Sequence, residues 1–127
     1  MTKANYVDGF VFTVTKKNFK AYKKMASDAS KVWKKFGALE YKECMGDDMH
    51  PNTGGGPKGT PFPRMAKARA GETVWFSFIT YRNKKHRDAV NKKVMAYFSK
   101  KYPDADHQDM PFDMKRMAYG GFKVVVG

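Results

Sequence analysis

Two runs of the chain carry large apolar side chains at nearly every position, and this feature constrains the fold more than any other. Residues 6–14 (YVDGFVFTV) and 73–81 (TVWFSFITY) are rich in the β-branched and aromatic residues that are typical of strands. Because consecutive side chains of a strand point to opposite faces, both faces of each strand are apolar. We therefore expect these two strands in the middle of a sheet.

Each of these strands is followed by a predicted helix. In residues 18–37, apolar residues recur every three or four positions and so lie on one helical face, and Gly37 is suited to end the helix. Residues 83–102 show a similar apolar stripe, with Asn83 as the expected N-cap and Pro103 directly after the end. Lysines cover much of the rest of the first helix, which predicts a basic ridge.

Two further strands and one loop complete the prediction. Residues 39–45 (LEYKECM) alternate apolar and charged side chains, as an edge strand would, and residues 116–126 (RMAYGGFKVVV) form the last strand. Residues 46–63 are rich in Gly and Pro and predict a long mobile loop. The resulting β-α-β-β-α-β order predicts an α+β, ferredoxin-like fold in one domain over residues 1–127. Such a fold has a four-stranded antiparallel sheet with two helices on one face.

Composition restricts where the protein acts and what it attracts. The 25 Lys and Arg residues outnumber the 12 Asp and Glu residues, so the formal net charge is +13 and the field should attract polyanions. The single cysteine, Cys44, excludes an intramolecular disulfide, and no apolar run approaches the roughly 20 residues of a membrane span. Since no export signal is visible, we expect a cytoplasmic protein with no membrane contact.

Two helices can cover only one face of the predicted sheet, so the other face needs a partner. The central strands place apolar side chains on both faces: Phe10 and Phe12 oppose Val7 and Val11, and Phe76 and Phe78 oppose Trp75 and Ile79. An uncovered face of this kind exceeds what monomers usually expose. A second sheet, a bound ligand or stacked nucleic-acid bases would cover it.

Several longer runs occur in the following order over nearly the whole chain: YVDGFV (6–11), FGAL (36–39), EC (43–44), RDA (87–89) with Asn91, MPFD (110–113), KRM (115–117) and YGGF (119–122). Together they resemble the YbaA-like bacterial family, a family of unknown function. The resemblance implies a protomer of the dimeric α/β-barrel superfamily, in which two sheets pack face to face in a homodimer. It implies no activity and no catalytic residue, so the catalytic residues are unknown, and we expect no cofactor.

The leading functional hypothesis is a homodimer whose cavity between sheet and helices binds a small apolar or aromatic molecule. The predicted pocket residues are Asp8, Phe10, Phe12, Trp75, Phe78, Phe112, Arg116 and Tyr119. Asp8 lies within an apolar strand and needs a partner, for which Arg116 on the neighbouring last strand is a candidate. Phe112 is expected to close the space between sheet and helices. Some proteins of this superfamily are cofactor-independent oxygenases, but the fold alone does not select that chemistry.

For the other polar residues, a structural role is favoured over a functional one. Cys44 is expected to be buried and inert, and Glu43, its neighbour on a strand, to point to the opposite face. His50, His86 and His107 lack the spacing of a metal site, so no metal is predicted. Arg87, Asp88 and Asn91 share one side of the second helix, where surface pairing is favoured over the lip of a pocket.

Two other classes of function stay open at this point. RNA-recognition motifs share the element order and stack bases on aromatic residues of the central strands, and they are often basic. The run over 73–81 lacks their aromatic octamer, and the lysine ridge lies on the helix side. Any polyanion binding should therefore be weak, independent of sequence and sensitive to salt. A structural or interaction dimer without a ligand is the third alternative.

Overall fold

The computed structural model describes residues 3–52, 54–56, 58–103 and 110–127. Its elements are β1 (Tyr6–Thr15), α1 (Phe19–Lys35), β2 (Glu40–Met45), α2 (Phe62–Met65), β3 (Glu72–Tyr81), α3 (Lys84–Lys101) and β4 (Ala118–Lys123), with 3₁₀ turns at Lys16–Asn18 and Met114–Arg116. The predicted β-α-β-β-α-β order is confirmed, and the short α2 is an addition to it.

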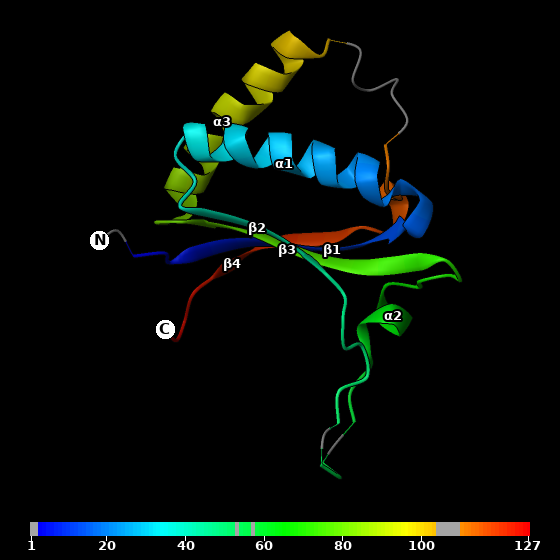
Figure 1. Cartoon of the computed structure of the whole chain (residues 1–127). Coiled ribbons are helices and arrows are strands. Elements are labelled where there is room, and N and C mark those ends of the chain that lie inside the picture. Colours follow the sequence, from blue (N-terminus) through cyan, green and yellow to red (C-terminus); the bar gives the residue numbers. More distant parts are fainter. Residues whose placement is uncertain (1–2, 53, 57, 104–109) are drawn as a thin grey trace.

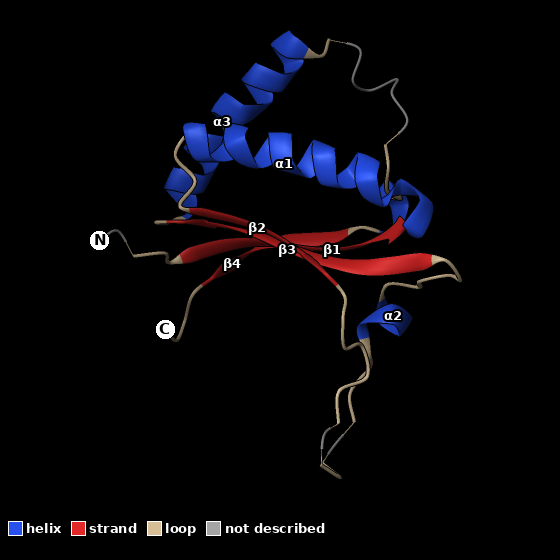
Figure 2. Ribbon diagram, viewed as in Figure 1, coloured by secondary structure: helices blue, strands red, loops and turns tan. Residues whose placement is uncertain are grey.

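The four strands form one antiparallel sheet in the order β2-β3-β1-β4 (Figures 1 and 2). β1 and β3 therefore occupy the middle and β2 an edge, as their apolar patterns predicted. The β1–β3 pairing runs over the full length of both strands, from Tyr6 opposite Tyr81 to Thr15 opposite Glu72. This long central pair fixes the frame to which the helices attach.

β4 is shorter than the strand predicted over 116–126. At its start, the Asp113 side chain accepts a hydrogen bond from the backbone N–H of Lys115 and caps a 3₁₀ turn, which diverts the chain before Ala118. At its end, Lys123 lies opposite Tyr6, the first residue of β1, and only one further backbone hydrogen bond, from Val124 N–H to the Asn5 carbonyl at 2.9 Å, follows among the described residues. The length of β4 therefore depends on its pairing with β1 and not on the length of its own apolar sequence.

α1 and α3 cover one face of the sheet, and α2 lies on the other side (Figure 1). Alternate residues of the central strands, such as Phe12 of β1 and Ile79 of β3, pack against these helices in two buried clusters. The predicted helix ends are confirmed: Gly37 adopts a φ of 115°, and the Asn83 side chain accepts from the backbone N–H of His86. α3 buries Val90 and Val94 near its middle, and its C-terminal end rises away from the sheet (Figure 1).

The segment between β2 and β3 runs away from the sheet on the side opposite the two long helices (Figure 1). The loop predicted over 46–63 ends slightly earlier, because α2 begins at Phe62. Pro63 lies in the first turn of this helix, a position that suits proline. Within the described part of the chain, no helix combines the length and apolar character needed to cross a membrane.

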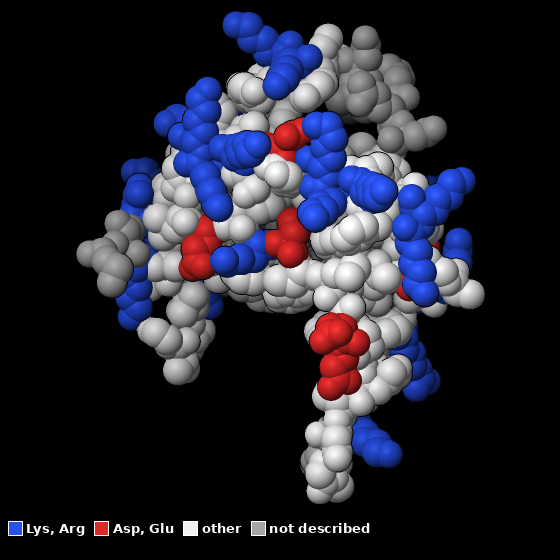
Figure 3. All heavy atoms as spheres, in the orientation of Figure 1, with Lys and Arg blue, Asp and Glu red and all other residues white. Residues whose placement is uncertain are grey.

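Exposed lysines gather over the two long helices in the face shown in Figure 3. On α1 they are Lys20, Lys23, Lys24, Lys31, Lys34 and Lys35. The basic ridge predicted for this helix is thus present on the side away from the sheet.

Candidate functional site: a pocket between helices and sheet

A cavity of about 940 Å³ lies between the helix-covered face of the sheet, the two long helices and the segment at residues 110–112. This volume is within the usual range of small-molecule sites, roughly 300–1,000 Å³. Aromatic rings dominate its walls: Phe10, Tyr22, Trp33, Tyr41, Phe98, Tyr102, Phe112 and Tyr119. Three acidic and two basic side chains interrupt this apolar lining: Asp8, Asp28, Glu43, Lys24 and Arg87.

Asp8 contributes a buried carboxylate to the pocket from near the start of β1. Its Oδ1 accepts a hydrogen bond from Nη1 of Arg87 on α3 at 2.7 Å. Arg87 also donates from Nε to Asp88 at 2.8 Å, and its guanidinium lies 5.1 Å from the centre of the Tyr6 ring. Burial raises the pKa of Asp8, and the Arg87 guanidinium offsets that increase only in part.

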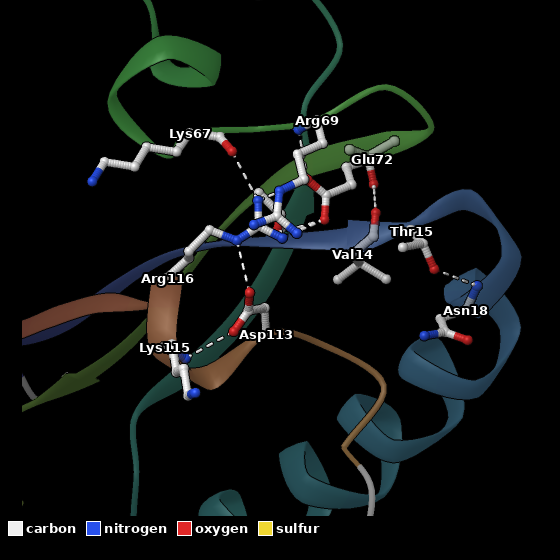
Figure 4. Close-up of polar contacts among 11 residues, drawn as sticks. Val14, Thr15, Asn18, Lys67, Arg69, Glu72, Asp113, Lys115 and Arg116 are labelled. Carbon is white, nitrogen blue, oxygen red and sulfur yellow. Dashed lines mark hydrogen bonds and ion pairs between the residues drawn. The ribbon is translucent and has the colours of Figure 1, made fainter.

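The predicted Asp8–Arg116 pair is wrong. Asp8 lies opposite Gly121 in the β1–β4 register, whereas Arg116 comes five residues before Gly121, in the 3₁₀ turn that precedes β4. Arg116 instead pairs with Glu72 at the start of β3, through Nη1 and Nη2, and with Asp113 through Nε at 2.7 Å (Figure 4).

The contacts of Arg116 form a clamp between segments that are distant in sequence. Its Nη1 also donates to the Lys67 carbonyl at 2.8 Å, and Glu72 accepts in addition from the Arg69 backbone N–H (Figure 4). Hydrogen bonds from Arg116 lower the pKa of Glu72 to about 2. The clamp, defined as Arg116 with Glu72 and Asp113, lies beside a smaller cavity and does not line the large one.

Glu43 is the second carboxyl of the pocket; it is half-buried, and two tyrosines hold it. The Tyr22 hydroxyl of α1 donates to the carboxylate at 2.8 Å from each oxygen, and the Tyr41 hydroxyl donates to Oε1 at 3.2 Å. Within the described residues, no Lys, Arg or His forms an ion pair with Glu43. Burial raises the pKa of Glu43, against the hydrogen bonds from Tyr22, Tyr41 and Ser77.

Glu43 is not among the predicted pocket residues, although the alternation of residues along β2 contains a signal for that position. Glu43 and Cys44 do point to opposite faces, as predicted. Tyr41 and Glu43 are two residues apart on β2 and therefore share a face, so an inward-facing tyrosine indicates an inward-facing glutamate. Cys44 is exposed, and the prediction that it is buried is wrong, because it lies opposite Phe76 on the face that the helices do not cover.

Arg87 and Asn91 line the pocket, so the preference for surface pairing at these positions is wrong. The Asn91 Oδ1 accepts from the Trp33 indole N–H at 3.2 Å and from the Tyr81 hydroxyl at 3.3 Å. Asp88 does behave as predicted, since it is 54% exposed and pairs with Lys84 and Arg87 on the helix surface.

The apolar residues predicted for the pocket divide into three groups. Phe10, Tyr119 and Phe112 line it, with the Phe10 and Tyr119 rings stacked at 6.4 Å. Phe12 and Trp75 face the same side but pack in the core beneath α1 and do not line the cavity. Phe78 lies on the opposite face of the sheet, because its partner in the register, Gly9, alternates with Asp8 and Phe10.

No group of three or more His, Cys, Asp or Glu side chains with metal-binding geometry occurs among the residues with described placement. His107 lies outside those residues. The His86 Nδ1 accepts from the backbone N–H of Arg82 at 3.0 Å, and burial lowers the pKa of this histidine. His86 thus acts at the start of α3 rather than as a metal ligand.

Comparison with known proteins agrees with the resemblance seen in the sequence. A family model described as "Protein of unknown function (DUF1428)" matches residues 5–114, which include the described pocket-lining residues except Tyr119, Gly120 and Gly121. The chain is 41% identical over 121 residues to the "Uncharacterized protein YbaA" of Escherichia coli strain K12, covering 95% of this chain and 97% of that protein. The protein of the same name from Shigella flexneri shows the same identity and coverage.

Proposed function

The chain belongs to the family described as protein of unknown function (DUF1428), and from its geometry we propose that it binds a small, largely apolar or aromatic molecule between helices and sheet. The observation that carries this proposal is the aromatic-lined cavity of about 940 Å³, which is also lined by the buried carboxyl of Asp8 and the half-buried carboxyl of Glu43. Apolar walls supply affinity, and a few placed polar groups orient the ligand. The proposal concerns binding, and oxygenase chemistry stays a prediction by fold analogy.

Rings from three different parts of the chain support this proposal. Phe10 comes from the middle of β1, Tyr22 from α1 and Phe112 from the segment before β4. Phe112 packs at 5.6 Å from the Phe12 ring and 5.7 Å from the Tyr22 ring, so it stands where the cavity meets the core. A ligand in contact with these three rings would bury most of its apolar surface.

A neutral aromatic dye, N-phenyl-1-naphthylamine, tests the pocket because its fluorescence increases in apolar surroundings. We expect saturable binding to the wild type, and loss of that binding in Ala29→Trp, whose new ring fills the cavity from α1. Ala89→Trp is the matched control, because Ala89 is exposed on α3 outside the cavity. Equal dye binding by both variants would contradict a ligand site at this place.

We also propose that two copies of the chain pair through the sheet face that lacks the long helices. Phe76 and Phe122 on this face are 45% and 62% exposed, and Val7 and Phe78 lie beside them. A monomer seldom leaves such an apolar patch in water. The face-to-face packing of two sheets would cover it and would leave the ligand pocket accessible on the other side.

A further inference from the structure

We infer that the pocket selects a small organic cation, an ammonium group carried on an apolar or aromatic body, and that Glu43 is the counter-ion for its charge. This inference rests on the proposed function, since it specifies the chemical class of the ligand that occupies the same cavity. It also runs against the charge of the whole chain, which is +13 and would by itself favour anions.

The described charged side chains that line the cavity differ in whether they have a partner of opposite charge. Arg87 is engaged by Asp8 at 2.7 Å and by Asp88 at 2.8 Å. Lys24 and Asp28 pair with each other at 3.5 Å on the exposed rim of α1. Among the described lining residues, Glu43 is the remaining charge, and its partners there are hydroxyl groups only. The cavity therefore has an excess of negative charge located at Glu43.

The groups around Glu43 favour its ionised form once a cation is present. The hydroxyls of Tyr22 and Tyr41 donate to its oxygens, which is the arrangement that a carboxylate needs and that a neutral acid uses less well. A positive charge in the cavity would replace the part of its solvation that the half-buried Glu43 carboxylate has lost. Among the described residues that line the cavity, an anionic ligand would meet no uncompensated cation.

Aromatic rings beside Glu43 supply the second feature that a cation needs. Tyr22 and Tyr41 hold the carboxylate, Trp33 lies 5.8 Å from the Tyr41 ring, and Phe98 lies 5.8 Å from Trp33. An ammonium group within about 6 Å of such ring centres is attracted by their π faces. The cavity thus combines a carboxylate with a continuous aromatic wall, which suits a cation that carries an apolar chain or ring.

A matched pair of probes tests this inference by calorimetric titration at neutral pH. 4-Phenylbutylamine carries an ammonium group, and 4-phenylbutan-1-ol has the same body without the charge. We expect the wild type to bind the amine at least about tenfold more tightly than the alcohol, as for one buried charge-assisted contact. In Glu43→Gln, which preserves the size of the side chain, the affinity for the amine should fall to that for the alcohol. Glu40→Gln, the same exchange at an exposed residue of β2 that does not line the cavity, is the matched control and should change either affinity less than about threefold.

The outcomes separate this inference from the proposed function. Equal affinities of the wild type for the two probes, or no effect of Glu43→Gln, would overturn the role of Glu43 while the ligand pocket stands. Failure of both probes and of the neutral dye would overturn the pocket itself. The comparison between probes uses the wild-type protein, so it tests the preference for a cation even if Glu43→Gln loses the contacts to Tyr22 and Tyr41 and unfolds.

Discussion

The Asp8 carboxylate on β1 lies 2.7 Å from Nη1 of Arg87 on α3, and this ion pair joins a central strand to a helix at the wall of the pocket. Both side chains are largely withdrawn from water, with 9% of Asp8 and 19% of Arg87 exposed. A buried pair contributes little relative to apolar side chains of the same size, but the loss of one partner leaves the other charge uncompensated. The pair therefore makes the position of α3 depend on one arginine.

Replacing Arg87 by Met should destabilise the protein by about 2–4 kcal/mol, somewhat below the range for a fully buried pair because Arg87 is partly exposed. The loss of stability should become smaller as the pH falls, because the uncompensated Asp8 has a raised pKa and becomes neutral when it binds a proton. Urea unfolding at several pH values measures both effects. The double variant Asp8→Asn/Arg87→Met is the control and should recover much of the loss, whereas additive losses would argue against coupling between the two residues.

The clamp of Arg116 with Glu72 and Asp113 predicts a stability loss in acid. The pKa of Glu72 is about 2 in the folded protein and lies near its ordinary value of 4.5 when the chain unfolds. The stabilisation is thus complete above pH 4.5 and is lost as the pH falls toward 2. Arg116→Lys, which cannot reproduce the two-pronged contact, should lower the melting temperature at neutral pH and flatten this acid dependence. Lys115→Ala, in the same turn, is the control, and an equal effect of the two variants would refute the clamp.

The element order and the central position of β1 and β3 could be predicted because they depend on local periodicity and on strands that are apolar on both faces. The partner of Asp8 could not, because it depends on the β1–β4 register and on the packing of α3, which bring Gly121 and Arg87 to Asp8 rather than Arg116. Alternation along β2 places Glu43 and Cys44 on opposite faces of the sheet, but it does not determine which of these two residues points toward the helices. That assignment needs the inward position of Tyr41, which follows from the three-dimensional packing.

Replacing Phe112 by Ala tests whether this ring closes the space between sheet and helices. Phe112 packs against the rings of Phe12 and Tyr22, so we expect a loss of about 2 kcal/mol, less than for a fully buried phenylalanine because it is partly exposed. The same change should alter dye binding by enlarging the cavity. Thermal unfolding and the dye titration measure the two effects, and Met114→Ala, on an exposed neighbouring residue, is the control. A variant that matches the wild type in both measurements would rule out this role.

The basic ridge on α1 predicts weak polyanion binding that does not depend on sequence. Affinity for heparin or for single-stranded RNA should fall about tenfold or more between about 50 and 200 mM salt, since contacts to phosphate or sulfate release counterions. Exchanging Lys20, Lys31 and Lys34 for Glu should weaken binding more than the same exchange at Lys58, Lys67 and Lys115, which are exposed outside the long helices. Binding that persists at high salt or that prefers one RNA sequence would contradict this expectation.

The open face of the sheet predicts a dimer that a single charge can disrupt. Phe76 is 45% exposed in the protomer, so Phe76→Glu should leave the fold intact, but in a face-to-face pair it would bury an uncompensated carboxylate. Light scattering after size exclusion should give twice the protomer mass of 14.5 kDa for the wild type and the protomer mass for the variant. Ala89→Glu, which adds the same charge on the exposed side of α3, should stay dimeric. A wild type that elutes at the protomer mass would show that another partner covers Phe76 and Phe122.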